Sequence, residues 1–154
     1  MRAHEAALEC DMHLIFGAQF HIHDGGWLIL LAADREGYGR LSQLITLARR
    51  RMGKGRYRLY RADLADGVRG CLAIVPSGQR PGPDLHTEDT AQGSAASSIP
   101  SAEYLDFIAD SFADAAWLAV ERHLLADDRQ RLRTLQALAQ ASGLPLLAAG
   151  DVHM

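Results

Sequence analysis

Cysteine is scarce in this sequence, and long hydrophobic runs are absent. The two cysteines among its 154 residues, Cys10 and Cys71, form no Cys-x-x-Cys pair, which indicates reduced thiols in a cytosolic protein. No apolar run approaches the length of a bilayer span, and no signal peptide opens the chain. We therefore expect a cytoplasmic protein with no membrane partner.

The sequence also lacks the common catalytic motifs. It contains no Walker P-loop, no Gly-x-Gly-x-x-Gly after a strand, no Gly-x-Ser-x-Gly elbow and no His-Glu-x-x-His pair. Nothing suggests a covalent nucleophile, so metal-assisted hydrolysis is the one chemistry with any support. The net charge of −3 by itself argues neither for nor against a nucleic-acid partner.

Strands and helices mostly alternate along the chain, whose 154 residues suit one domain. This order predicts an α/β fold with largely parallel strands. A segment rich in Pro, Gly, Ser and Thr, residues 77–102, is expected to be a flexible internal loop. The expected strands are 13–20, 27–33, 70–75, 116–120 and 146–150, and the expected helices are 2–9, 40–52, 103–112 and 127–142.

The first expected helix begins without a cap residue or a preceding strand. Residues 2–9 have the composition of a helix already under way. The sequence therefore predicts a truncated start.

Polar side chains follow several of the expected strands, most clearly the last one. Asp151 and His153 lie two residues apart, so an extended chain directs both to one side. Carboxylate and imidazole are suitable ligands for Zn²⁺, Mn²⁺ or Fe. The alternative is a strand end with a polar turn. Other candidates at strand ends are Gln19, His21, His23, Glu121 and His123.

The pair His21 and His23 has two interpretations. Both imidazoles could face one way as metal ligands. They also run into Asp24-Gly25-Gly26, a strong turn signal, so the pair is equally typical of a hairpin edge.

Basic residues gather after the second expected helix. Seven of the 16 Lys and Arg residues lie within positions 49–61, interleaved with Tyr57 and Tyr60. Such a segment could bind phosphates while its tyrosines stack on bases. The alternative is a solvated helix end and an exposed loop. The candidate nucleic-acid ligands are Arg50, Arg51, Lys54, Arg56 and Arg58.

Four segments together resemble a known family. Residues 28–46, LILLAADREGYGRLSQLIT, and residues 143–154, GLPLLAAGDVHM, are similar to segments of bacterial C-family DNA polymerases. Residues 16–20, FGAQF, resemble that family's GAEF segment. Residues 54–64, KGRYRLYRADL, resemble its error-prone branch in particular. The matches occur in the family's order and cover nearly the whole chain apart from the loop 77–102.

The resemblance is to the N-terminal PHP domain (polymerase and histidinol phosphatase) of these enzymes. It implies that residues 1–154 are a partial PHP domain, an incomplete form of a distorted (βα)₇ barrel. In the family, a metal cluster at the strand carboxyl ends can support phosphoesterase or exonuclease activity, and in many members it is degenerate. The whole protein is a DNA-directed DNA polymerase, a nucleotidyltransferase, and its error-prone branch is implicated in translesion synthesis, DNA repair and damage-induced mutagenesis.

Carried over by position, little of the metal cluster remains. Asp151 and His153 match its last two ligands, whereas Gln19 occupies the place of a usual Glu ligand. Trp27 and Val75 stand where metal-binding members carry His and Cys. The resemblance therefore implies that this chain does not bind a divalent metal (Zn, Mn or Fe) stably. The polymerase palm, fingers and thumb are missing from this chain, so it cannot polymerise DNA by itself.

Three functions remain open. The first is a structural PHP fragment of an error-prone polymerase, with the rest of that polymerase as partner and DNA reached through the whole enzyme. The second is a small metal-dependent phosphoesterase. The third is a nucleic-acid or protein docking module working through residues 49–61. A truncated barrel would also expose strand edges, and we expect self-association through these edges.

Overall fold

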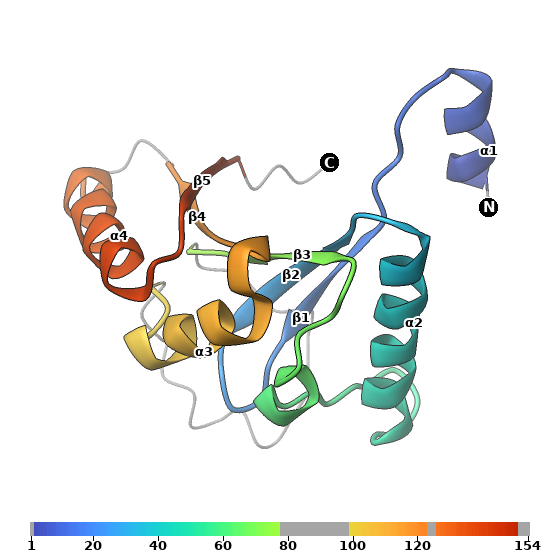
Figure 1. Ribbon diagram of the computed structural model, residues 1–154, viewed down its shortest axis with the longest axis horizontal. Coiled ribbons are helices and arrows are strands. Elements are labelled where there is room, and N and C mark those ends of the chain that lie inside the picture. Colours follow the sequence, from blue (N-terminus) through green and yellow to red (C-terminus); the bar gives the residue numbers. More distant parts are fainter. Residues whose placement is uncertain (1, 78–98, 123–125, 151–154) are drawn as a thin grey trace.

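The computed structural model describes residues 2–77, 99–122 and 126–150, which form a five-stranded sheet with helices packed on it (Figure 1). The strand order is β1-β2-β3-β4-β5. The strands are β1 Gly17–His21, β2 Trp27–Ala32, β3 Cys71–Val75, β4 Ala116–Glu121 and β5 Leu146–Ala149. The helices are α1 Arg2–Glu9, α2 Arg35–Arg50, α3 Ala102–Phe112 and α4 Asp128–Ser142, with short 3-10 turns η1 Arg61–Leu64 and η3 Ala113–Ala115.

The structure confirms an α/β fold, but the sheet is mixed, with antiparallel pairs beside the parallel strands that the sequence predicted. β1–β2 and β2–β3 pair antiparallel, whereas β3–β4 and β4–β5 pair parallel. The turn Asp24–Gly26 closes β1 and β2 into a hairpin, in which His21 pairs with Trp27. Only β2 is reversed, so the carboxyl ends of the other four strands share one edge of the sheet.

One apolar core lies between the sheet and helices α2, α3 and α4. Strand residues Phe20, Leu30 and Leu118 belong to the same buried cluster as Leu44 of α2 and Leu135 of α4. All three helices therefore cover one face of the sheet. Alternate strand residues point to the other face.

Helix α2 begins five residues earlier than the sequence predicted. The segment from Asp34 to Gly39 lies before the helix that the sequence predicted to begin at residue 40. In the structure the Asp34 carboxylate caps the helix, its Oδ1 accepting a hydrogen bond from the Gly37 backbone N–H at 2.7 Å. β1, in contrast, begins later than predicted, at Gly17 instead of residue 13.

Other predicted elements agree closely with the structure. The predicted helix ending at Ser142 is followed by Gly143, whose φ of 73° is the left-handed conformation typical of a helix terminus. The predicted helices 2–9 and 103–112 match α1 and α3 to within one residue. Most of the predicted loop, residues 78–98, lies outside the described residues. Among the described residues, no helix has both the length and the apolar character needed to cross a bilayer.

Candidate functional site

Two of the predicted polar residues, His21 and Glu121, lie at the shared edge of the sheet, and a third, Gln19, lies in the middle of β1, where it pairs with Ile29. Gln19 and His21 of β1 and Glu121 of β4 alternate with core residues on their own strands, so all three belong to the face opposite the helices. Gln19 is exposed, and Glu121 is 2% exposed. The sequence therefore placed His21 and Glu121 correctly at this edge, whereas Gln19 lies inside β1 because that strand extends to His21.

His21 and Glu121 are well separated along this edge. Two strands lie between β1 and β4, and three inter-strand spacings amount to about 14 Å along the sheet. Within the residues that the structure describes, no group of three His, Cys, Asp or Glu side chains could hold a metal ion. Asp151, His153 and His123 lie outside the described residues.

The histidines at the end of β1 have different aromatic neighbours. The His21 ring meets Trp27 edge-on, with centroids 5.0 Å apart, and the His23 ring meets Tyr60 at 5.3 Å. Burial, and after it the nearby charge of His23, lowers the pKa of His21. His21 is therefore held towards its neutral form, in a packed aromatic setting typical of a hairpin edge.

Trp27 and Val75 occupy the remaining positions that the resemblance connects with metal binding. Trp27 is half-buried beside His21, and Val75 is fully buried in the core. Neither indole nor isopropyl offers a ligand atom to a divalent cation.

Part of the predicted basic segment is already neutralised within the protein. The Arg51 guanidinium donates to both carboxylate oxygens of Asp63, at 2.5 and 2.7 Å, and stacks over the Tyr60 ring. Hydrogen bonding from Arg51 is the main cause that lowers the pKa of Asp63. Asp63 Oδ2 also accepts from the Tyr60 backbone N–H. Arg51 is therefore committed to this network and is not a free phosphate ligand.

The tyrosines interleaved with the basic residues are also engaged. Tyr57 Oη accepts a hydrogen bond from the His21 backbone N–H at 2.8 Å, and its ring contacts Phe20. Tyr60 lies between Arg51 and His23. Exposed cations of the segment include Arg49, Arg50, Lys54 and Arg56, whereas Arg58 is half-buried and engaged in an interaction.

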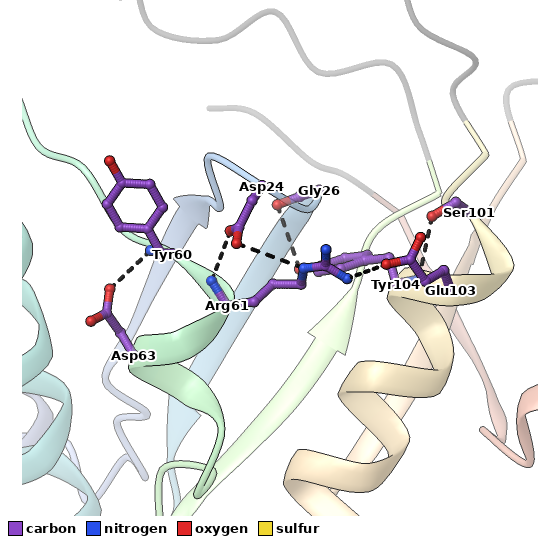
Figure 2. Close-up of polar contacts among 8 residues, drawn as sticks. All are labelled: Asp24, Gly26, Tyr60, Arg61, Asp63, Ser101, Glu103 and Tyr104. Carbon is purple, nitrogen blue, oxygen red and sulfur yellow. Dashed lines mark hydrogen bonds and ion pairs between the residues drawn. The ribbon is translucent and has the colours of Figure 1, made fainter.

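A second polar network joins three elements that are distant in sequence (Figure 2). The Arg61 backbone N–H donates to Asp24 at 2.8 Å, and its guanidinium donates to Glu103 at 2.7 Å. Tyr104 Oη lies within hydrogen-bonding distance of the Gly26 carbonyl. Burial raises the pKa of Tyr104 far above its ordinary value. The network ties the β1–β2 turn and η1 to the start of α3.

Sequence reasoning missed these two networks. Arg61 is 37 residues from Asp24 and 42 residues from Glu103, so no local spacing pairs them. Asp63 did carry a signal, because it lies three residues after Tyr60, where a carboxylate can bond back to the first backbone N–H of a turn.

Comparison with known proteins gives a consistent result. The chain is 48% identical over 145 residues to an error-prone DNA polymerase of Azoarcus sp. (strain BH72). It is 41% identical over 154 residues to one of Pseudomonas savastanoi pv. phaseolicola and 42% identical over 156 residues to one of Aromatoleum aromaticum. These matches cover 94–100% of this chain but only 12–14% of each relative. No protein-family model matches the chain.

Proposed function

We propose that this chain is a PHP-type segment of an error-prone DNA polymerase and that its role there is structural. The observation that carries the proposal is the 41–48% identity to polymerases of that description over essentially the full length of the chain. Because the chain spans 12–14% of those relatives, polymerisation and DNA binding belong in this proposal to the larger protein. Translesion synthesis would then be the process that the segment serves.

The side chains at the positions that the resemblance connects with metal binding support a degenerate metal site. Gln19 offers a neutral amide, a poorer ligand for a divalent cation than a carboxylate. Trp27 and Val75 offer no ligand atom, and His21 packs against Trp27. Asp151 and His153 are the two remaining candidate ligands, and in this proposal they are too few to hold Zn, Mn or Fe stably.

The proposed architecture is part of a distorted (βα)₇ barrel. Four of the five strands run in one direction, and α2, α3 and α4 cover one face, as the outer helices of a barrel would. Among the described residues, β1 and β5 each pair with a single strand. Those two edges are where further strands would continue the barrel.

A chimaeric polymerase tests the structural role. Residues 1–154 would replace the matching segment of the Azoarcus polymerase, and primer extension and thermal unfolding would be measured. We expect primer extension to be retained and to be insensitive to Gln19→Ala. Leu118→Asp should prevent the polymerase from folding, because burying an unpaired carboxylate costs several kcal/mol. Loss of extension in the Gln19→Ala chimaera would contradict a purely structural role.

The second candidate is a metal-dependent phosphoesterase, which the geometry favours less. Restoring a carboxylate with Gln19→Glu should raise metal affinity only if the other ligands are in place. Titration of Mn²⁺ or Zn²⁺ against both proteins measures this directly. No gain in affinity would remove the phosphoesterase from consideration.

The third candidate is docking of nucleic acid through the basic segment. The exposure of Arg50, Lys54 and Arg56 favours it, and the engagement of Tyr57 and Tyr60 argues against base stacking. The candidate predicts salt-sensitive binding of single-stranded DNA that weakens in Arg56→Ala. Arg51→Ala is the matched control, because Arg51 is already paired with Asp63.

A further inference from the structure

Exposed apolar side chains are concentrated at one end of the molecule. The described part of the chain has seven exposed large hydrophobic side chains, and five of them lie in or beside the segment that follows α1. Leu8 and Met12 are each 69% exposed, and Ile15 is 57% exposed. We call the five residues the N-terminal patch: Leu8, Met12, Ile15, Phe16 and Tyr38.

The N-terminal patch is held to the body by aromatic contacts. The Phe16 ring meets the Tyr38 ring of α2 edge-on at 5.2 Å, and His4 of α1 lies 6.1 Å from Phe16. Figure 1 shows α1 standing beyond the start of α2 and away from the sheet. Apolar side chains so exposed and so close together mark an interaction surface.

The surroundings of the N-terminal patch are acidic. Glu5, Glu9 and Asp11 are exposed around it. Arg35 is exposed at the start of α2, near Tyr38 in sequence, but Glu5, Glu9 and Asp11 outnumber it, so the rim is acidic on balance. A partner for this surface must therefore combine apolar groups with positive charge.

The opposite end of α2 provides that combination. Arg49 and Arg50 are exposed there, and residues 49–56 include no acidic residue. The outer side of α2 has a shallow, open hollow around Leu47, which is 43% exposed. The residues lining the hollow are Ser42, Gln43, Thr46, Leu47 and Arg50.

The hydroxyl groups in this hollow do not require water. Ser42 Oγ donates to the Tyr38 carbonyl and Thr46 Oγ1 donates to the Ser42 carbonyl, each at 2.9 Å. Covering them would therefore leave neither donor unsatisfied. These two hydroxyl groups therefore do not oppose an apolar side chain in the hollow.

We propose that a second copy of this chain covers these surfaces, with the two α2 helices antiparallel. Helix α2 has 16 residues and is about 24 Å long, so its two ends are distinct surfaces. In the antiparallel arrangement, the N-terminal patch and its acidic rim in each copy meet the basic end of α2 in the other. The contact is reciprocal, so two-fold symmetry closes the assembly as a dimer.

A charge-exchange experiment tests the dimer by sedimentation velocity. One variant carries Glu5→Arg with Glu9→Arg, and the other carries Arg49→Glu with Arg50→Glu. Each variant alone brings like charges together at both contacts, so its dimer dissociation constant should rise at least about tenfold. An equimolar mixture should form a heterodimer at least as tight as the unchanged dimer, because both contacts again join opposite charges.

The controls separate the contact from net charge and from folding. Arg129→Glu with Arg133→Glu makes the same change in charge as Arg49→Glu with Arg50→Glu. It lies on the exposed side of α4, far from α2 in Figure 1, and should leave the dimer intact. Circular dichroism melts confirm that each variant is folded. The unchanged dimer should also weaken as salt is added.

Three results would overturn the proposal. The first is a monomer at every concentration of the unchanged chain. The second is folded charge variants that self-associate as tightly as the unchanged chain. The third is a mixture of the two variants that associates no better than either alone. The proposed polymerase role is tested separately by the chimaera, so either idea can fail without the other.

Discussion

Gly37 lies where helix α2 passes closest to the start of β3. A Cβ atom added there would lie 1.9 Å from the Gly70 carbonyl oxygen, which belongs to the backbone and cannot rotate away. Gly37→Ala should therefore push α2 off the sheet and lower the free energy of unfolding by about 2–4 kcal/mol. Urea unfolding measures the change.

Gly39 is the matched control for that prediction. It lies on the same helix, and a Cβ added there would meet nothing within 4 Å. Gly39→Ala should be neutral or stabilising by up to about 1 kcal/mol, because alanine is the better helix former. Equal losses in the two variants would show that the close approach to Gly70 is not the cause.

His21 should titrate below the ordinary imidazole value of 6.5. Burial and the nearby His23 both oppose its protonation in the folded state, so the unfolded chain takes up that proton at higher pH. The contribution of His21 to stability is therefore fully present above pH 6.5 and decreases as the pH falls towards the lowered pKa. An NMR titration of the imidazole Cε1–H follows the group directly.

His23→Ala separates the two causes. Removing the neighbouring imidazole should raise the His21 midpoint only in part, because burial is the larger cause and remains. A His21 midpoint at or above 6.5 in the unchanged protein would refute the packed environment beside Trp27.

Helix caps decide where the elements begin. Asp34 caps α2 through its side chain, whereas Asp127 at the start of α4 makes no such hydrogen bond. Asp34→Ala should cost about 1 kcal/mol of stability, and Asp127→Ala should cost clearly less. Thermal unfolding of the two variants compares the caps. Equal costs would mean that the Asp34–Gly37 bond adds nothing.

The start of α2 shows why some boundaries escaped the sequence. The sequence predicted a helix from residue 40, and the two glycines within Asp34–Gly39 are poor helix formers. Gly37 is nevertheless required in the helix because α2 touches Gly70, 33 residues later in the chain. Such a contact leaves no local signal. Gly143 did leave one, and that end of α4 was predicted correctly.

The candidate site was predictable only in part for the same reason. Alternation along β1 and β4 puts Gln19, His21 and Glu121 on one face of the sheet, and the structure confirms His21 and Glu121 at its carboxyl edge. The reversal of β2 followed from the Asp24–Gly26 turn, which the sequence offered as an alternative. The engagement of Arg51 and Arg61 depends on side chains brought in by folding.

On the scale of the whole molecule, the chain combines a polymerase-like sequence with an edge poor in metal ligands. Sequence identity connects it with error-prone DNA polymerases, and the mixed sheet places Gln19, His21 and Trp27 together on β1 and β2. Their side chains are an amide, a packed imidazole and an indole. We therefore propose that the chain is a structural segment of a polymerase and that it holds no working metal site.

Metal content tests this claim most directly. The chain would be purified without chelator or affinity-tag metal and analysed by elemental mass spectrometry, with Asp151→Ala as the control variant. We expect no stoichiometric metal in either protein. Near-stoichiometric Zn, Mn or Fe that is lost in Asp151→Ala would contradict it, and would show that a working metal site survives at the end of β5.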